Sequence, residues 1–308
     1  MGGNSWNHTD WDQFSSKTRS QSTRQTFKQQ GIHPDLNPYG VRVRESRDSA
    51  ANPESHAIIV APDVTASMGK LSEVLVCTGV GVLVEELLAR RPVKNPHVMC
   101  MGVGDAYGRY LDSPGDDAPL QVTQFEADIK IATQLGQIWL EGGGSGNGGE
   151  SYHLAWYFAA RHTSIDCFEK RKKKGYLFTV GDENPHKVLT RQQVKTIIGD
   201  DIEHDLTSAE LLTMASRSYH VFHVLVEESG SCDASVKANW QNLLGERAIP
   251  MSDHTKLAEL IVSTIQVNEG ASVADVMQSW SGDTSLVVAR GLGGLAPATA
   301  TGRGMVRF

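Results

Sequence analysis

Short apolar runs alternate with longer amphipathic stretches along most of the chain. The runs have the length and the Val, Ile, Leu and Tyr content of buried strands, and the stretches between them repeat their apolar positions with a helical period. This alternation predicts an α/β fold with a doubly wound, mostly parallel central sheet. The expected strands are 56–62, 98–103, 175–180, 219–226 and 248–251, and the expected helices are 71–90, 126–140, 151–162, 190–198, 208–216, 235–244, 254–266 and 273–280.

One further run has a different pattern. Residues 119–125 alternate apolar and polar side chains, and a short link rich in Pro, Gly and Asp joins them to the strand at 98–103. A short link suits an antiparallel neighbour, and the alternation suits a strand with one exposed face. The sequence therefore predicts one antiparallel strand at the edge of the sheet.

The two ends of the chain do not follow the alternation. Residues 1–52 are rich in Ser, Gln, Arg, Asn and Asp, carry scattered aromatics and show no period. We expect an arm whose aromatics anchor it on its own domain or on a neighbouring subunit, although the composition also suits disorder. Residues 271–308 become Gly-rich after a short helix, which is typical of a flexible or partner-ordered tail. The domain proper is expected at 53–270.

Asp63, Thr65 and Ser67 follow the first predicted strand at alternate positions. In an extended loop such side chains point the same way, so one carboxylate and two hydroxyls can converge on a cation. Oxygen ligands favour Mg²⁺ or Mn²⁺ over Zn²⁺. The alternative is that Thr65 or Ser67 caps the helix expected from Leu71, because Ser, Thr and Asp are the preferred N-cap residues.

A second carboxylate follows a later strand. Asp182 comes directly after the apolar run at 175–180, and a glycine loop at 140–151 lies between the two sites just ahead of a helix. Loops that leave the carboxyl ends of neighbouring parallel strands meet at one edge of the sheet, where such folds bind ligands. We therefore expect the two carboxylates and the glycine loop to lie together.

These loops resemble those of the von Willebrand factor A family, over most of the chain from about Asn52 to Gly270. That family has a metal-ion-dependent adhesion site made of a first loop of the form D-x-[ST]-x-S, a second loop after a later helix, and an aspartate in a third loop. Asp63, Thr65 and Ser67 fall on the first-loop positions, and Asp182 falls on the third-loop aspartate.

The second loop departs from the commonest family pattern, because no Thr follows its glycines. It is more similar to the variant that carries a G-G-G-x-x-x-E type loop. The available oxygens belong to Ser145, Asn147, Glu150 and Ser151, and we expect Glu150 or Ser145 to be the ligand.

The resemblance implies a Rossmann-like domain of a prokaryotic or phage-type intracellular protein, with Mg²⁺ or Mn²⁺ as its cofactor. It implies a protein interaction module in which the ion contacts a Glu or Asp of the partner. For intracellular members it also implies work beside AAA+ ATPases of the MoxR type or inside larger assemblies. No catalytic residue is expected, so the protein is not expected to be an enzyme.

Composition narrows the choice of partner and compartment. The formal net charge is -7 and the pI is about 5.9, which argues against a general nucleic-acid binder. The basic run Arg171–Lys174 is expected to be a solvated helix end, with contact to an acidic partner as the alternative. The four cysteines are too widely spaced for a zinc site or a disulfide framework. Because the amino end lacks a secretory signal and no window approaches the ~18 apolar residues of a membrane span, we expect a soluble, cytoplasmic protein.

Two other functions remain open. The chain could be a structural component, such as a virion protein or a homo-oligomer, that assembles through its arms while the metal loops only stabilise the sheet edge. An aspartyl phosphotransferase is disfavoured, because enzymes that resemble haloacid dehalogenases place a second Asp where Thr65 stands. Asp105 is expected to be a loop cap more than an additional metal-site carboxylate, and His186 is expected to be a loop histidine.

Overall fold

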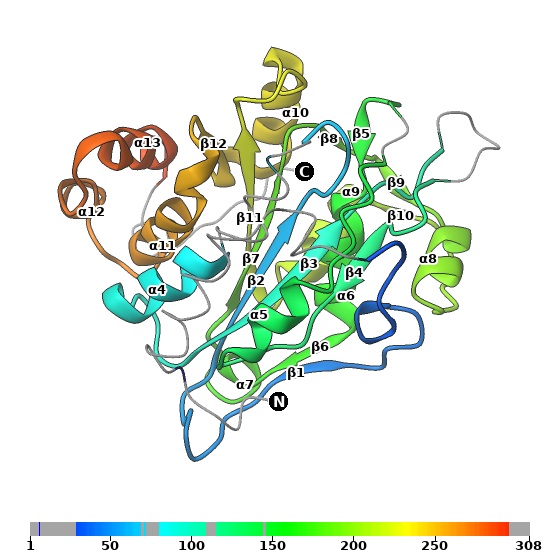
Figure 1. Cartoon of the computed structure of the whole chain (residues 1–308), viewed down its shortest axis with the longest axis horizontal. Helices are drawn as coiled ribbons and strands as arrows, with labels where there is room; N and C mark the ends of the chain where they lie inside the picture. The colour runs from blue at the N-terminus through cyan, green and yellow to red at the C-terminus, as the bar shows by residue number, and fades with distance from the viewer. Residues whose placement is uncertain are drawn as a thin grey trace.

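A six-stranded sheet forms the centre of the molecule (Figure 1). The structure is a computed structural model and describes residues 6, 29–68, 71, 80–108, 115–143 and 146–295. The strand order is β12-β11-β7-β2-β3-β4, and all neighbours are parallel except β4, which pairs antiparallel with β3. The mostly parallel sheet with one antiparallel edge strand is thus confirmed. Its strands are β2 (His56–Pro62), β3 (Pro96–Val103), β4 (Leu120–Val122), β7 (Gly175–Gly181), β11 (Tyr219–Val226) and β12 (Ala248–Met251).

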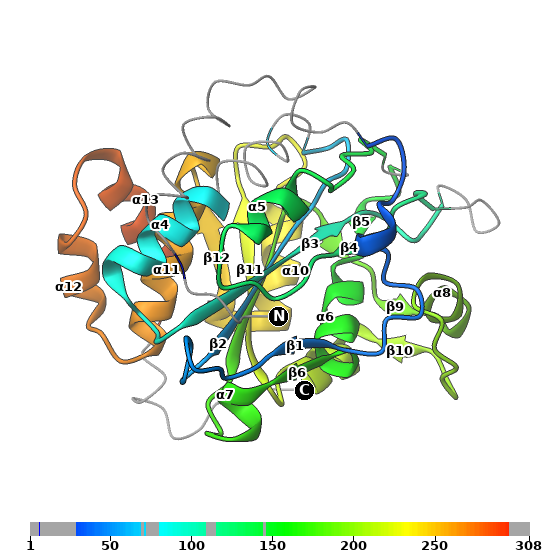
Figure 2. The same ribbon diagram turned by 60° about the horizontal axis from the view of Figure 1, so that its bottom comes forward.

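Helices cover both faces of the sheet because its strands are apolar on both sides. Ile58 and Val60 pack toward one helical layer, whereas Ala57, Ile59 and Ala61 pack toward the other. The first layer holds α4 (Val80–Arg90), α5 (Lys130–Leu135), α11 (Leu257–Asn268), α12 (Val273–Gln278) and α13 (Gly282–Leu292). The second layer holds α6 (Tyr152–Arg161), α7 (Asp166–Glu169), α8 (Arg191–Ile197), α9 (Ser208–Ala215) and α10 (Ala234–Leu244), as the two views show (Figure 2).

The carboxyl end of the described chain differs from the expectation. Residues 282–292 form α13, where the sequence had suggested the start of a Gly-rich tail. A side chain at Gly291 would press into Leu260 of α11 and Ile249 of β12. Gly291 is therefore a point of close helix packing, which its composition could not distinguish from a flexible segment.

The amino-terminal segment is partly built into the fold. Strand β1 (Arg44–Ser46) pairs in parallel with β6 (Thr163–Ile165), an element that its local sequence did not predict. Trp6 also lies on the chain's own domain, where its indole N–H donates to the Pro96 carbonyl at 2.8 Å. We expected the aromatics of this segment to anchor it either on its own domain or on a neighbouring subunit. Trp6 lies on its own domain.

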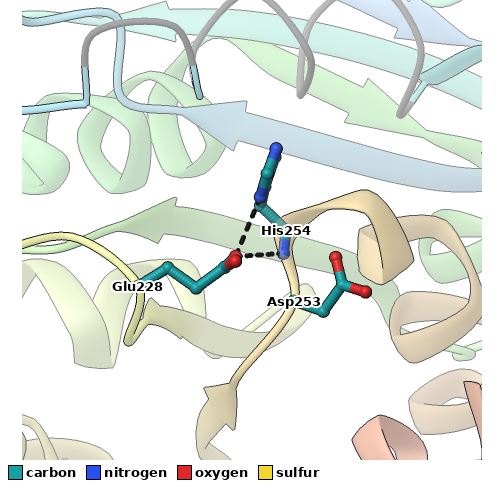
Figure 3. Close-up of side chains that lie close together, drawn as sticks. All are labelled: Glu228, Asp253 and His254. Atoms are coloured by element: carbon teal, nitrogen blue, oxygen red, sulfur yellow. Dashed lines mark hydrogen bonds and ion pairs between the residues drawn. The ribbon is translucent and has the colours of Figure 1, made fainter. Parts of the chain in front are cut away.

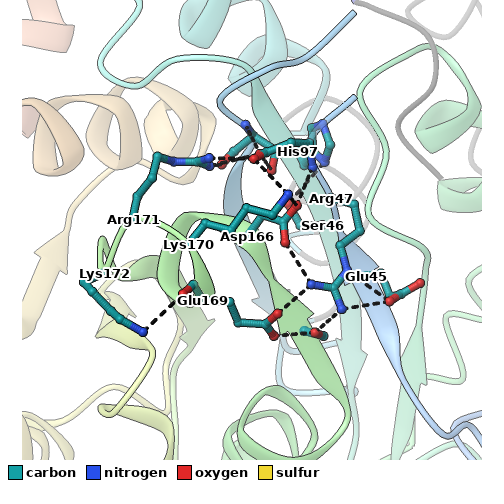
Figure 4. A network of polar contacts seen from close by, with 12 residues as sticks. Glu45, Ser46, Arg47, His97, Asp166, Glu169, Lys170, Arg171 and Lys172 are labelled. Atoms are coloured by element: carbon teal, nitrogen blue, oxygen red, sulfur yellow. Dashed lines mark hydrogen bonds and ion pairs between the residues drawn. The ribbon is translucent and has the colours of Figure 1, made fainter. Parts of the chain in front are cut away.

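A charged network joins β1 to the segment that leads into β7 (Figure 4). Arg47 contacts Asp166 at 2.9 Å, and Arg171 contacts Asp48 at 2.7 Å. Lys170 lies 2.7 Å from Asp166 and 3.3 Å from Asp48. Part of the basic run therefore meets acidic partners within the same chain.

Smaller elements complete the structure around the loops. The strand β5 (Gly149–Glu150) pairs in parallel with β8 (Asn184–Pro185), and β9 (Val188–Leu189) pairs antiparallel with β10 (Leu206–Thr207). The short 3-10 helices are η1 (Pro34–Leu36), η3 (Gly245–Arg247) and η4 (His254–Lys256). Among the described residues, none of the helices has the length and apolar character needed to cross a bilayer.

Candidate metal centre

The loop after β2 is fixed between two neighbouring strands. The Asp63 N–H donates to Val180 of β7 at 2.9 Å, and the Val64 N–H donates to Val103 of β3 at 2.8 Å. The fully buried Asp63 carboxylate accepts two bonds at Oδ1, from the Thr65 N–H and the Thr65 hydroxyl, both at 2.7 Å. These bonds are a local loop cap of the kind that aspartate commonly makes. They also place the Thr65 hydroxyl beside the carboxylate.

The structure brings the first and third loops together, as predicted. The Ser67 hydroxyl lies 3.2 Å from the Thr65 hydroxyl and donates to Asp182 Oδ1 at 3.1 Å. Asp182 follows β7, the strand next to β2, and is fully buried. Its second oxygen, Oδ2, is buried and accepts no hydrogen bond from any residue that the structure describes.

Glu150 is the second-loop candidate whose side chain can be placed. It ends β5, its side chain is buried, and its Oε2 has no hydrogen-bond partner within the described part of the chain. Ser145, the other candidate, lies outside the described residues. A buried carboxylate oxygen without a donor is costly, so its presence indicates a missing partner for the oxygen.

The carboxyl groups of the three loops disfavour one another's charge. Burial, followed by the nearby charges of Asp63 and Asp105, raises the pKa of Glu150 far above its usual range. Burial also raises the pKa of Asp63, with the neighbouring Asp182 charge adding to it and hydrogen bonds from Thr65 opposing it. The pKa values of Asp182 and Glu183 are raised by burial as well.

Ser229 and Ser231 lower the pKa of Asp182 and so oppose the effect of burial, but neither hydroxyl bonds Asp182 Oδ2. The strongest charged influences on Asp63 and Glu150 are other carboxylates. Within the described ranges, the region is thus an acidic centre whose strongest charged neighbours are carboxylates.

This donor set fits a hard divalent cation. Asp182 lies beside the paired hydroxyls of Thr65 and Ser67, and the charge of Asp63 acts on Glu150. Asp182 Oδ2 and Glu150 Oε2 have no hydrogen-bond partner among the described residues, but Asp63, Glu150 and Asp182 do not all bring an oxygen within 4.8 Å of one another. A ligand set here would combine carboxylate oxygens with the hydroxyls, which favours Mg²⁺ or Mn²⁺ over a softer metal.

Asp105, after β3, is a loop cap as predicted, and it is saturated with donors. Its Oδ1 accepts from the Tyr107 N–H at 2.9 Å and from the Ser151 hydroxyl at 3.2 Å, and its Oδ2 accepts from the Asn147 amide at 2.7 Å. The His186 ring nitrogen Nε2 lies 2.7 Å from the same carboxylate. The His186 contact was missed, because the two residues are far apart in sequence and no local pattern links them.

Tyr152, the first residue of α6, is the other residue that sequence analysis missed. Its hydroxyl donates to Asp63 Oδ2 at 2.9 Å, and its side chain is fully buried. The only sequence signal is its place directly after the second loop. Apolar periodicity assigns a tyrosine at this position to the core, and its hydroxyl partner is set by the fold.

A second acidic group lies in the loops that follow β11 and β12 (Figure 3). Glu228, Asp253 and His254 each offer a ligand atom within 4.8 Å of the others. However, Glu228 already accepts from the His254 N–H at 2.6 Å and contacts its Nδ1 at 2.8 Å, while Asp253 caps η4 through Thr255. These contacts account for the group as a loop cap without a metal.

A groove of about 700 Å³ lies beside the second and third loops. Its walls come from residues 147–149, residues 184–187, the start of α9 and the outer face of α10. Carboxamides link these walls, because Asn239 donates to Asn184 at 2.9 Å and Asn184 donates to the Gly148 carbonyl at 3.3 Å. The groove is therefore formed by the same loops that carry Glu150 and Asp182.

Comparisons with known proteins do not assign the chain to a family. No family model matches the sequence, and no curated protein matches it. Among solved structures, the chain is similar to the open conformation of the pilus adhesin SpaC from Lactobacillus rhamnosus GG, with 11% identity and a TM-score of 0.44. The match covers 72% of this chain but 31% of the adhesin, and a similarity this low carries no argument about function.

Proposed function

We propose that this protein is a protein interaction module that depends on a divalent metal, and that it is not an enzyme. The observation that carries the proposal is the buried Asp182 carboxylate beside the hydroxyls of Thr65 and Ser67, with an oxygen that has no partner among the described residues. Glu150 has such an oxygen too, and the charge of Asp63 acts on it. A divalent cation would supply positive charge to this acidic centre. Mg²⁺ or Mn²⁺ suits a set of carboxylate and hydroxyl oxygens best.

The roles of the residues follow from their contacts. Asp182 and Glu150 would bring the charge, and Thr65 and Ser67 would bring neutral hydroxyl oxygens. Asp63 would offer its remaining acceptor position to the ion and would orient the Thr65 hydroxyl through the 2.7 Å bond between them. A bound ion supplies an electrophilic centre that a carboxylate from outside can reach, because Mg²⁺ keeps exchangeable water among its six ligands.

The groove beside the loops offers a surface for the partner. Its wall residues include amides and hydroxyls, which can donate to and accept from a peptide main chain. A partner segment lying there would run past the second and third loops. A Glu or Asp of that segment is the side chain that we expect at the ion.

The resemblance to the von Willebrand factor A family supports the same proposal on the residues that match its motif. Under this proposal the partner belongs to an intracellular assembly, and an AAA+ ATPase of the MoxR type is the partner class that the resemblance favours. The arms remain a second means of assembly. Oligomers that persist after metal chelation would favour assembly through the arms over assembly through the metal.

The proposal can be tested with Mn²⁺ as a paramagnetic probe. Chelator-stripped protein is loaded with Mn²⁺, and the relaxation rate of water protons is followed while Ac-Gly-Glu-Gly-NH₂ is added. We expect the peptide to displace metal-bound water and lower the relaxation enhancement, with no effect from the matched Ac-Gly-Gln-Gly-NH₂. Failure of the wild type to bind Mn²⁺, or equal responses to the two peptides, would overturn the proposal.

A further inference from the structure

Tyr152 connects the three loops of the candidate metal centre. It follows Glu150 and Ser151 of the second loop, and its hydroxyl donates to Asp63 of the first loop at 2.9 Å. Its ring lies edge-on to Trp240, with 5.5 Å between ring centroids, and the Trp240 indole N–H donates to the Glu183 carbonyl of the third loop at 2.9 Å. One buried side chain therefore links all three loops.

The surroundings of Tyr152 hold its ring in a single place. His223 lies edge-on to Tyr152, with centroids 4.9 Å apart, and stacks on Trp240 at 3.5 Å. All three side chains are fully buried. Gly181, at the end of β7, leaves the space for the hydroxyl, because a Cβ at that position would collide with it. A buried ring packed in this way has little freedom to turn.

The Tyr152 hydroxyl occupies one of the hydrogen-bond acceptor positions of the Asp63 carboxylate. A carboxylate offers about four acceptor positions. Thr65 fills two of them at Oδ1, and Tyr152 fills one at Oδ2. Asp63 therefore keeps one position, in a fixed direction, and it cannot offer both of its oxygens to a cation while these bonds last.

We infer that Tyr152 is a positioning residue that makes the site selective for Mg²⁺ over Ca²⁺ by restraining the Asp63 carboxylate. The inference rests on the proposed metal-dependent function. Mg²⁺ demands near-octahedral oxygen geometry at short distances, whereas Ca²⁺ accepts more ligands, two-oxygen carboxylate ligation and looser geometry. A carboxylate restrained by three donors can bind Mg²⁺ through one oxygen in a fixed direction. It cannot turn to bind Ca²⁺ through both oxygens.

The test is Tyr152→Phe, which removes the hydroxyl and keeps the ring. Mg²⁺ and Ca²⁺ are titrated separately into chelator-stripped wild type and variant by isothermal titration calorimetry. Removing a group that orients a ligand typically costs about 10-fold to 100-fold in metal affinity. We expect a loss of about that size for Mg²⁺ and a smaller loss, or a gain, for Ca²⁺, so that the ratio of the two dissociation constants falls about 10-fold or more.

Tyr219→Phe is the matched control. Tyr219 is equally buried and its hydroxyl contacts Thr163 at 2.7 Å, at the opposite end of the sheet. The control should lose stability without a change in the Mg²⁺ to Ca²⁺ ratio. Gly181→Ala, which should displace the hydroxyl sterically, should change the ratio in the same direction as Tyr152→Phe.

The outcomes separate this inference from the proposed function. Metal binding by the wild type with an unchanged ratio in Tyr152→Phe would overturn the inference and leave the proposed function standing. A similar change of ratio in the Tyr219→Phe control would also overturn it. Absence of Mg²⁺ binding by the wild type, with or without the glutamate peptide, would overturn both.

Discussion

The two ends of the sheet bury acidic side chains in opposite ways. At the amino end, Asp48 and Asp166 are enclosed by Arg47, Lys170 and Arg171 (Figure 4). Burial there acts to raise the pKa of Asp48, but hydrogen bonds from Arg171 and Ser55 lower it far below its usual range. At the carboxyl end, burial raises the pKa of Asp63, Glu150 and Asp182.

The difference lies in where the compensating charge comes from. The amino end carries its own cations, so it is complete as a structural network. The carboxyl end carries hydroxyls, and two of its carboxylate oxygens have no hydrogen-bond partner among the residues that the structure describes. Buried charges are retained in proteins when they are paired or bind metals. The contrast is the reason why we propose a ligand at the carboxyl end and none at the amino end.

The largest expected effect comes from a substitution that breaks the charged network at the amino end of the sheet. Arg171→Met removes two bonds to Asp48 and one to the Ser55 carbonyl. Among the described residues, Lys170 at 3.3 Å is then the one charged contact left to the partly buried Asp48. We expect a loss of about 2–3 kcal/mol in the free energy of unfolding, measured by urea denaturation, with Mg²⁺ affinity unchanged. Lys94→Met, which breaks the exposed pair with Glu54, is the control and should change stability far less than Arg171→Met does. A change in Mg²⁺ affinity in Arg171→Met would contradict the separation of the two ends.

A change of pH should alter the stability of the protein through the buried carboxyl groups at the carboxyl end of the sheet. An acid whose pKa is raised by folding binds its proton more tightly in the folded chain, so its contribution to stability is present at low pH and is lost as the pH rises from the unfolded value through the folded value. Between about pH 7 and 8 ordinary histidines are already mostly neutral, the Tyr side chains of the unfolded chain stay protonated, and most of its Cys thiols do too. We expect the metal-free protein to lose about 1–2 kcal/mol in this window, because Glu150 keeps its proton in the folded chain and is ionised in the unfolded chain.

The control for the pH effect is Glu150→Gln, which cannot ionise and should show a smaller slope of stability against pH. Saturating Mg²⁺ should also reduce the slope in the wild type, because the ion favours the ionised carboxylates. Equal slopes in wild type and Glu150→Gln would show that Glu150 does not hold its proton in the folded chain.

The smallest expected effect is a gain in stability. Asp182→Asn removes a buried negative charge whose Oδ2 has no donor, and the new amide keeps an oxygen to accept from Ser67. We expect the metal-free variant to be more stable than the wild type by about 1 kcal/mol, measured by thermal unfolding. Asp201→Asn, at an exposed aspartate that pairs with Lys195, is the control and should change stability less than Asp182→Asn does. Destabilisation by Asp182→Asn in the absence of metal would mean that the charge is already compensated within the chain.

Local patterns predicted the sheet well but not the contacts around the centre. Strand β11 and strand β12 have the predicted bounds, since short apolar runs between polar turns specify buried strands without help from distant residues. Helix α13 was not predicted, because a glycine such as Gly291 usually indicates a flexible segment. Its close packing against Leu260 is visible in the structure alone. The meeting of Asp63, Ser67 and Asp182 followed from the rule that parallel strands end at one edge.

The bonds from Tyr152 to Asp63 and from His186 to Asp105 could not be predicted in the same way. Each joins residues that are far apart along the chain. Each also depends on which rotamer and which loop path the packed core allows, and neither leaves a period or a spacing in the sequence. The sequence therefore predicts which loops meet, whereas the orientation of their side chains requires the fold.

The most direct test of the account is a calorimetric titration of Mg²⁺ into chelator-stripped wild type, Asp63→Ala and Asp182→Ala, with Arg171→Met as a control from the other end of the sheet. The account predicts one Mg²⁺ site in the wild type and in Arg171→Met, and loss of that site in both aspartate variants. Unchanged Mg²⁺ binding in the aspartate variants, or no binding to the wild type even with the glutamate peptide present, would contradict it.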